Sequence, residues 1–129
     1  MGAGYMAREH IRAFHDLKNV HMAGIMSRTR KRAEDLALEY NIPYVCDSVA
    51  ELHEKTKADL VVVTVPELEA NRVSRSCFEY PWTVLLEKPA GYNLEDAQEI
   101  AGLAKQDNRN AFVALNRRYY SSTRAALSD

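Results

Sequence analysis

The stretch Leu85-Leu86-Glu87-Lys88-Pro89-Ala90-Gly91 decides the fold, because a largely apolar run changes within two residues to charge and proline. The run from residue 82 to residue 86 has the composition of a buried strand, and a segment with helical periodicity follows it. In open α/β sheets, ligands lie beyond the carboxyl ends of the strands. The pattern therefore predicts that Glu87 and Lys88 stand at a ligand-binding edge, although solvated charges at an ordinary strand end would look the same.

Similar strand-like runs alternate with helical segments along the rest of the chain. The clearest strand is residues 58–65, whose β-branched side chains suit a parallel strand covered on both faces. The alternation predicts a single α/β domain over residues 1–129, with a doubly wound, mostly parallel, Rossmann-like sheet. The other predicted strands are residues 20–26, 44–46, 82–86 and 111–115. The predicted helices are the segment after residue 5, then residues 30–40, 48–55, 68–78 and 94–107, with a short helix ending near residue 127.

Helix caps and one apolar stripe can also be predicted. A capping box from Ser48 to Glu51 starts the third helix. Asn93 is the expected cap of the helix at residues 94–107. The periodicity of that helix predicts a buried stripe formed by Leu94, Ala97, Ile100, Ala101 and Ala104.

A glycine motif at the start of the chain predicts a phosphate-binding helix. The first seven residues read Met-Gly-Ala-Gly-Tyr-Met-Ala, which is a G-x-G-x-x-A pattern. Gly2 would make the tight turn, Gly4 would let the backbone approach a pyrophosphate, and Ala7 would pack the helix against a strand. The phosphates would lie on the free N–H groups of the helix start, which include those of Tyr5 and Met6. The strand that usually precedes this motif, at the centre of the sheet, is missing here, so we expect unpaired strand edges.

A basic cluster follows the strand at residues 20–26. Units that bind NAD carry an Asp or Glu roughly 20 residues after the glycines, to hold the ribose. Here no acid occurs between Lys18 and Lys31. Three cations open the next helix, which is unfavourable by roughly 0.3–1 kcal/mol each unless an anion binds there. The pattern favours the 2′-phosphate of NADP, with NAD less favoured, and the expected contacts are Ser27, Arg28, Thr29 and Arg32.

Both features have an interpretation without a ligand. The glycines could belong to a helix start at a frayed chain end. The basic cluster could be solvated, with Lys31 and Arg32 pairing with Glu34 or Asp35.

Composition excludes several other classes of protein. The chain has 129 residues, 47% of them hydrophobic and 27% charged, with a formal net charge of −1. This balance gives no reason to expect nucleic acid or a membrane as a partner. No apolar run approaches the roughly 18–20 residues of a transmembrane helix, and no signal-peptide pattern is present. Cys46 and Cys77 lack metal-ligand spacing, so we expect no metal site and free thiols in a reducing cytoplasm.

Taken together, the motifs resemble those of a known family. They occur in the order Gly2-x-Gly4-x-x-Ala7, Ser27-Arg28-Thr29, Glu87-Lys88-Pro89 and Asn116-Arg117-Arg118-Tyr119. This series is similar to the N-terminal half of the glucose–fructose oxidoreductase / inositol dehydrogenase (Gfo/Idh/MocA) family, and the resemblance covers nearly the whole chain. It implies a nicotinamide-dependent oxidoreductase that acts on sugars, cyclitols or related hydroxy compounds.

The resemblance also implies roles for individual residues. Lys88 would be the catalytic residue, beside the nicotinamide ring and the substrate hydroxyl. Glu87 would shape the nicotinamide-ribose side of the pocket. Asn116 is assigned to the nicotinamide end. Arg117 is a cofactor-binding candidate, and of the two arginines it is the one that better suits a structural role. A polar strand end that bonds loop carbonyls would explain Asn116 and Arg117 as well. The second wall of the crevice would be Val65, Pro66 and Glu67, where the family commonly has Thr-Pro-Asn.

The family's second domain, which supplies the substrate pocket, the acid–base His or Asp and the oligomer interface, has no counterpart in the sequence. None of the four histidines falls in a motif that would replace the acid–base group. We therefore expect little or no turnover from this chain alone, and a fragment with open sheet edges could form homo-oligomers. Two other classes stay open: a non-catalytic dinucleotide-binding or interaction module, and a structural fragment that binds nothing.

Overall fold

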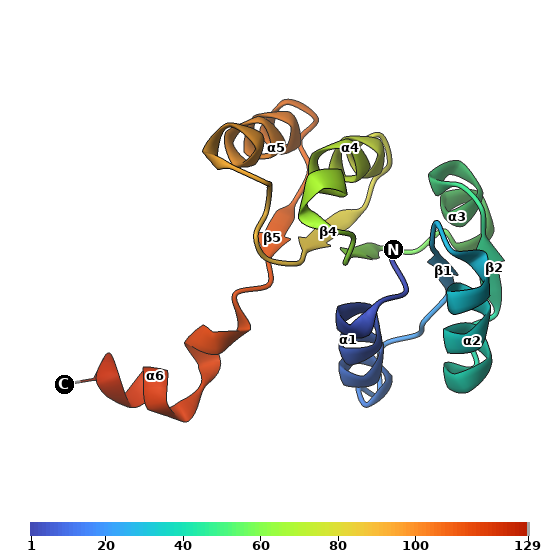
Figure 1. Ribbon diagram of the computed structural model, residues 1–129, viewed down its shortest axis with the longest axis horizontal. Coiled ribbons are helices and arrows are strands. Elements are labelled where there is room, and N and C mark those ends of the chain that lie inside the picture. Colours follow the sequence, from blue (N-terminus) through green and yellow to red (C-terminus); the bar gives the residue numbers. More distant parts are fainter. Residues whose placement is uncertain (129) are drawn as a thin grey trace.

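The computed structural model describes residues 1–128, in which five parallel strands are covered by helices (Figure 1). β1 (Gly24–Met26) pairs with β2 (Tyr44–Cys46). A separate sheet has the order β3 (Leu60–Val63), β4 (Thr83–Leu86), β5 (Ala111–Val113). The parallel α/β architecture is confirmed. The single sheet is not, because the position between β1 and β3 holds no strand in the described part of the chain.

The helices follow the predicted order. They are α1 (Tyr5–His15), α2 (Arg30–Tyr40), α3 (Val49–Thr56), α4 (Glu67–Phe78), α5 (Leu94–Gln106) and α6 (Ser121–Ala126), with a short 3₁₀ helix, η1 (Asn116–Tyr119), before α6. Figure 1 shows α4 and α5 side by side next to β4 and β5, whereas α1 and α2 lie together near β1. No helix within residues 1–128 is long and apolar enough to cross a membrane.

Both predicted caps are present. The Ser48 hydroxyl accepts a hydrogen bond from the Glu51 N–H at 3.1 Å, and the Glu51 carboxylate accepts one from the Asp47 N–H at 2.7 Å. The first bond is that of the predicted capping box at the start of α3, whereas the second comes from the residue before the Ser48 cap and not from Ser48 itself. At α5, the Asn93 side-chain oxygen accepts from the Asp96 N–H at 2.9 Å.

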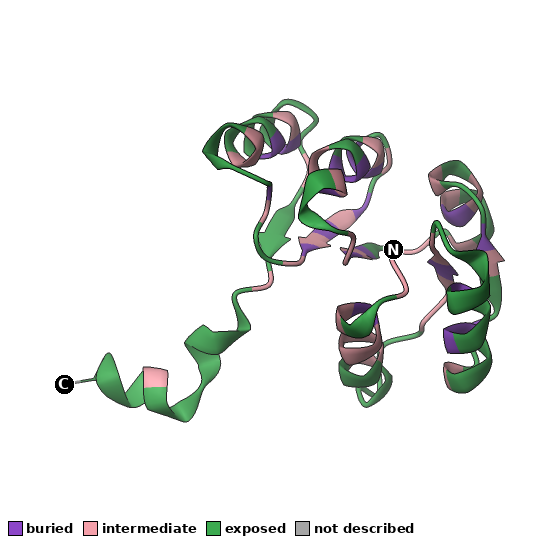
Figure 2. Ribbon diagram, viewed as in Figure 1, coloured by how far each residue is buried: buried purple, intermediate pink, exposed green. Residues whose placement is uncertain are grey.

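Two hydrophobic clusters form the core, and their buried residues are drawn in purple in Figure 2. The larger cluster joins β3 and β4 to α4 and α5 and also includes Cys46 of β2 and Leu52 of α3, so it spans both sheets. The smaller cluster joins β1 to α1 and α2. The predicted stripe on α5 was too wide. Ile100 and Ala104 are buried, but Leu94 is 73% exposed and Ala101 is also exposed. These two residues lie seven positions apart on one edge of the helix, and no other element within residues 1–128 covers that edge.

Three strands are shorter than predicted. Residues 20–23 are not part of β1, and β3 and β5 each end two residues earlier than expected. A strand is maintained by its neighbours, and β1 has only the three-residue β2 beside it. The early ends are therefore consistent with the empty position between the two sheets.

Met1 and Gly2 provide the only backbone link between the facing edges of the two sheets that is seen within residues 1–128. The Met1 nitrogen donates to the Val62 carbonyl at 2.5 Å, and the Met1 carbonyl accepts from the Thr64 N–H at 2.8 Å. On the other side, the Gly2 N–H donates to the Met26 carbonyl at 2.8 Å. These two residues thus have the hydrogen bonds of a central parallel strand.

Gly2 cannot be replaced without strain, because its φ is +102° and a Cβ would lie 2.6 Å from the Thr64 side-chain oxygen. We expect Gly2→Ala to lower the free energy of unfolding by about 2 kcal/mol or more, from left-handed backbone strain and steric overlap. Gly102→Ala is the matched control, since Gly102 lies in α5 with open space around it. It should raise stability by up to about 1 kcal/mol. Urea unfolding measures the free energy of unfolding of both variants. Equal changes in Gly2→Ala and Gly102→Ala would contradict the argument.

Burial lowers the pKa of the Met1 ammonium from 8.0 to about 6. Between pH 6 and pH 8 the unfolded chain then binds more protons than the folded chain. The free energy of unfolding should therefore rise from pH 6 to pH 8, by about 2–3 kcal/mol. Acetylating Met1 removes the titration, so the difference between the acetylated and free chains isolates this effect. Parallel stability–pH profiles for the two forms would contradict it.

Candidate functional site

The carboxyl ends of β1, β3 and β4 lie at the same edge of the molecule as the start of α1. Their strands are parallel within each sheet, and the Met1–Gly2 link holds the two sheets in a common direction. The loops after these strands carry Ser27, Val65 and Glu87. The edge that the sequence predicted to be ligand-binding is therefore assembled from segments far apart in the chain.

α1 begins with free backbone donors and open space. Gly4 occupies the N-cap position, and no side chain caps the helix. A Cβ at Gly4 would meet no atom within 4 Å. The first N–H groups of a helix have no partner within the helix and carry its positive dipole end. In contrast to α3 and α5, whose starts are capped, α1 therefore offers these groups to an external anion.

A cavity of about 310 Å³ lies beside this helix start. Arg8 and Arg32 both line it, but Arg8 forms an ion pair with Glu39. Within residues 1–128, Arg32 has no ion-pair partner. The remaining lining residues are Ala3, Gly4, Tyr5, Asp35 and Leu36.

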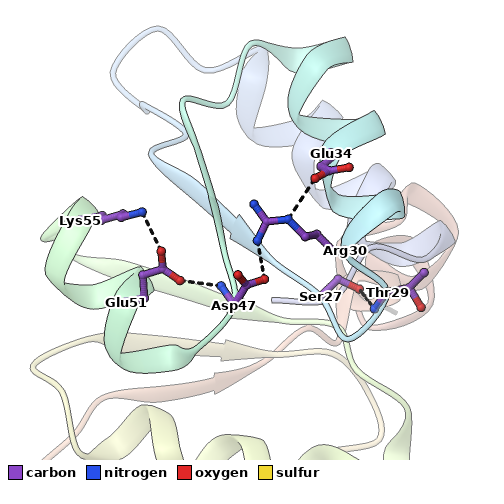
Figure 3. A network of polar contacts seen from close by, with 7 residues as sticks. All are labelled: Ser27, Thr29, Arg30, Glu34, Asp47, Glu51 and Lys55. Carbon is purple, nitrogen blue, oxygen red and sulfur yellow. Dashed lines mark hydrogen bonds and ion pairs between the residues drawn. The ribbon is translucent and has the colours of Figure 1, made fainter.

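The basic cluster at α2 separates into paired and unpaired cations. Arg30 contacts Glu34 at 3.0 Å and Asp47 at 2.5 Å, as Figure 3 shows. Lys31 contacts Asp35 at 2.7 Å. The interpretation of the cluster as solvated ion pairs is therefore correct for Lys31, but neither Arg28 nor Arg32 has a partner among the residues described.

Ser27 and Thr29 lie where β1 leads into α2. The Thr29 N–H donates to the Ser27 hydroxyl oxygen at 3.3 Å, also drawn in Figure 3. Thr29 is the N-cap residue of α2, but its side chain makes no capping bond. No acid lies in the first turn of this helix. The start of α2 therefore combines uncapped N–H groups, hydroxyl groups and unpaired positive charge.

Glu87 is held in place at the end of β4. One carboxylate oxygen accepts from the Lys88 N–H at 2.9 Å, and the other lies 3.3 Å from Nε2 of His10. The Glu87 and His10 side chains are only 10% and 17% exposed. Lys88 itself is exposed, and its bond to Pro89 is a cis peptide. Lys88 is thus an exposed residue that directly follows a carboxylate in contact with α1.

Sequence reasoning missed His10. Its signal was present, because His10 lies three residues after the buried Ala7 and beside Ile11 on the inner side of α1. The ring also stacks on Phe14, with centroids 6.5 Å apart. A histidine on an apolar helix face is usually a packed core residue, and nothing in the chain's local pattern pointed to a partner 77 positions away.

The predicted second wall follows β3. Val65 packs against the larger core cluster, whereas Pro66 and Glu67 are exposed at the start of α4. The Arg72 side chain, and at longer range Arg28, lower the pKa of the nearby Glu69.

Asn116 and Arg117 lie on an arm beyond the sheet. The Ala114 N–H donates to the Leu86 carbonyl at 2.8 Å, which keeps the chain next to β4 up to this point. After it, η1 and α6 project from the body, and nearly all of their residues are exposed (Figure 2). The assignment of Asn116 to the nicotinamide end, and of Arg117 to cofactor binding, stays a prediction.

A family model described as "Oxidoreductase family, NAD-binding Rossmann fold" matches residues 1–115. The chain belongs to this family, Gfo/Idh/MocA. It is therefore an oxidoreductase-family Rossmann domain of the kind that binds nicotinamide dinucleotides. The family assignment confirms the resemblance found from the motifs. No protein of curated function matches the sequence.

Solved structures show the same fold. A provisionally assigned NADPH-dependent oxidoreductase from Desulfitobacterium hafniense is 22% identical, with a TM-score of 0.89 over 96% of this chain and 36% of its own. An Agrobacterium radiobacter oxidoreductase, in complex with NAD⁺, L-tartaric acid and magnesium, is 20% identical, with a TM-score of 0.90; the match covers 98% of this chain and 37% of that protein. The myo-inositol 2-dehydrogenase of Lactobacillus plantarum is 19% identical, with a TM-score of 0.87; the match covers 98% of this chain and 38% of that protein. The chain thus spans little more than a third of these proteins.

The open space at Gly4 gives a test that separates stability from binding. The φ of Gly4 is −91°, which alanine adopts freely, so Gly4→Ala should change the free energy of unfolding by less than about 0.5 kcal/mol. A Cβ there would occupy the approach to the helix N–H groups, so dinucleotide affinity should fall roughly tenfold or more. Urea unfolding and calorimetric titration measure the two effects. Unchanged affinity would mean that the ligand does not approach α1 at Gly4.

Proposed function

We propose that the chain is the NADP-binding domain of an oxidoreductase that transfers a hydride between nicotinamide and a sugar, cyclitol or related hydroxy compound. The observation that carries the proposal is the uncapped start of α1, which opens beside the cavity that Arg32 lines. Bound nicotinamide would supply the hydride donor or acceptor. The residues of this chain would bind and orient it.

The start of α1 fits a pyrophosphate. The N–H groups of Tyr5 and Met6 would donate to the phosphate oxygens, and the absence of a side chain at Gly4 leaves room for their approach. The positive φ of Gly2 turns the chain from its strand-like position into the helix. A phosphate-binding site would explain both glycines, whereas a frayed helix start would require neither of them.

The preference for NADP rests on the charges at α2. Arg28 and Arg32 would contact a 2′-phosphate, with Ser27 and Thr29 donating from their hydroxyl groups. The other two cations nearby are already neutralised by acids. The similar Desulfitobacterium hafniense protein is assigned as NADPH-dependent, whereas the Agrobacterium radiobacter protein was solved with NAD⁺.

Lys88 would polarise the substrate oxygen that gains or loses a hydride, or hold the acid–base group. Glu87 would border the nicotinamide ribose, and its bonds to the Lys88 N–H and to His10 fix its position. The second wall would be Val65, Pro66 and Glu67. Asn116 would lie at the nicotinamide end, with Arg117 as a further cofactor contact. Sugar or cyclitol substrates are supported by the similar myo-inositol 2-dehydrogenase.

The NADP preference can be tested with three alanine variants. Arg28→Ala and Arg32→Ala should each weaken NADP binding roughly tenfold to a hundredfold, because each removes a charge-assisted bond to phosphate. NAD binding should change little. Lys31→Ala is the matched control, since Lys31 is exposed and already paired with Asp35. Calorimetric titration of all four chains with both dinucleotides provides the measurement.

Two results would refute the preference. One is equal affinity of the native chain for NAD and NADP. The other is a loss of NADP affinity in Lys31→Ala that matches the loss in Arg28→Ala, which would indicate a general effect of positive charge instead of a defined phosphate contact.

A further inference from the structure

His10 joins α1 to the end of β4. Its Nε2 lies 3.3 Å from a Glu87 carboxylate oxygen, although the two residues are 77 positions apart in the chain. Among the described residues, no other side-chain hydrogen bond or ion pair joins α1 to β3, β4 or the segments that follow them. The contact therefore connects the helix whose uncapped start faces the proposed phosphate position with the strand end that precedes Lys88.

The chemistry of this pair places a hydrogen on Nε2 of His10. A carboxylate can only accept hydrogen bonds, so the hydrogen between the two groups must belong to the ring. The neutral tautomer with Nε2–H and the charged ring both meet this requirement. The neutral tautomer with Nδ1–H does not, because its Nε2 is itself an acceptor. The contact is thus a donor–acceptor bond with a defined direction, from His10 to Glu87.

The Glu87 carboxylate has few other partners. Its side chain is only 10% exposed, and no Lys or Arg within residues 1–128 forms an ion pair with it. A carboxylate removed from water is costly unless it is hydrogen-bonded. One oxygen accepts from the Lys88 N–H, and the other is bonded by His10. Without His10, the second oxygen would lack a donor, and the carboxylate would gain by turning toward solvent.

Packing alone does not require a histidine at this position of α1. The ring stacks on Phe14, with centroids 6.5 Å apart, and Ala7 one turn away belongs to the smaller hydrophobic cluster. A leucine on this side of the helix would provide similar apolar contact without a polar group to satisfy. The polar atom of His10 is explained by Glu87.

We propose that His10 is a positioning residue for the nicotinamide half of the dinucleotide, acting through Glu87, an inference that rests on the proposed function. His10 lies about 7–8 Å from Tyr5 along the axis of the same helix, so a movement of the phosphate-binding N–H groups also moves the imidazole. The imidazole orients Glu87, which in turn accepts from the Lys88 N–H where the nicotinamide ribose would bind. The two halves of the dinucleotide, which contact opposite sheets, are thereby kept in register.

The test compares ligands with and without the nicotinamide ribose by calorimetric titration of the full chain. NADP is compared with 2′-phosphoadenosine 5′-diphosphate, and NAD with ADP, so that the result does not depend on the 2′-phosphate. His10→Leu keeps an apolar side chain but removes the donor. It should weaken binding of both dinucleotides roughly fivefold to tenfold or more, and leave the affinity of the truncated ligands within about twofold.

Further variants show whether the effect passes through Glu87. His10→Gln can place an amide N–H at the position of Nε2, so it should recover most of the lost affinity, whereas the shorter amide in His10→Asn should not. Adding His10→Leu to Glu87→Ala should cause no loss beyond that of Glu87→Ala alone. His15→Ala is the matched control, because His15 lies on the same helix and its side chain is 54% exposed. It should leave every affinity unchanged.

A measurement without ligand tests the bond itself. Long-range proton–nitrogen correlation spectra distinguish a protonated from a bare Nε2, and we expect the His10 ring of the native chain to carry a hydrogen on Nε2. This experiment needs neither a variant nor a dinucleotide. The Gln and Asn variants also differ by only one methylene, so their comparison decides the binding question if His10→Leu does not fold.

Three results would overturn the inference. The first is a bare Nε2 in the native chain, which would exclude a bond from His10 to Glu87. The second is a loss in the His10 variants that is equal for dinucleotides and truncated ligands, which would mean that His10 only maintains α1. The third is additive losses in the double variant. A native chain that binds none of the four ligands would instead refute the proposed function, and this inference with it, whatever the ring spectrum shows.

Discussion

The structure depends on the backbone hydrogen bonds of Met1 and Gly2. These two residues bond to β3 on one side and β1 on the other, and no other backbone bond joins the facing edges within residues 1–128. The larger hydrophobic cluster also spans the two sheets, because Cys46 of β2 and Leu52 of α3 belong to it together with residues of β3 and β4. The relative position of the sheets, and with it the geometry of the ligand-binding edge, is therefore set by these backbone bonds together with the packing of that cluster. The left-handed backbone of Gly2 then directs the chain away from Thr64 and into α1.

Much of the fold could be predicted because the signals were local. The range of α2, the caps Ser48 and Asn93, and the short strand β2 follow from periodicity and from side-chain-to-backbone bonds within four residues. The division into two sheets was anticipated only as unpaired edges. The lengths of β1, β3 and β5 could not be predicted, because a strand's end depends on neighbours that lie elsewhere in the sequence.

The candidate site shows the same limit. The motifs named the correct strand ends, but they could not say which cations of the basic cluster are neutralised. That depends on Asp47, which belongs to a different loop and contacts Arg30 from there. The contact of His10 with Glu87 could not be predicted either, since it joins α1 to the residue after β4, 77 positions away in the chain. Ion pairs between residues far apart in the sequence therefore decide which cations of the cluster remain free to bind a ligand.

The two sides of the ligand-binding edge are joined by side chains as well as by backbone bonds. The uncapped start of α1 and the Glu87 carboxylate belong to opposite sheets, and the His10 side chain contacts Glu87 from α1. A shift of one sheet against the other would change the distance between the start of α1 and Lys88, and it is resisted by the bonds of Met1 and Gly2, by the His10–Glu87 contact and by the larger hydrophobic cluster. A dinucleotide bound as proposed would contact both sheets at once, so its binding would also hold the sheets together. A ligand that binds only when the two sheets are joined stabilises that arrangement. A change that weakens the Met1–Gly2 link should therefore also weaken cofactor binding.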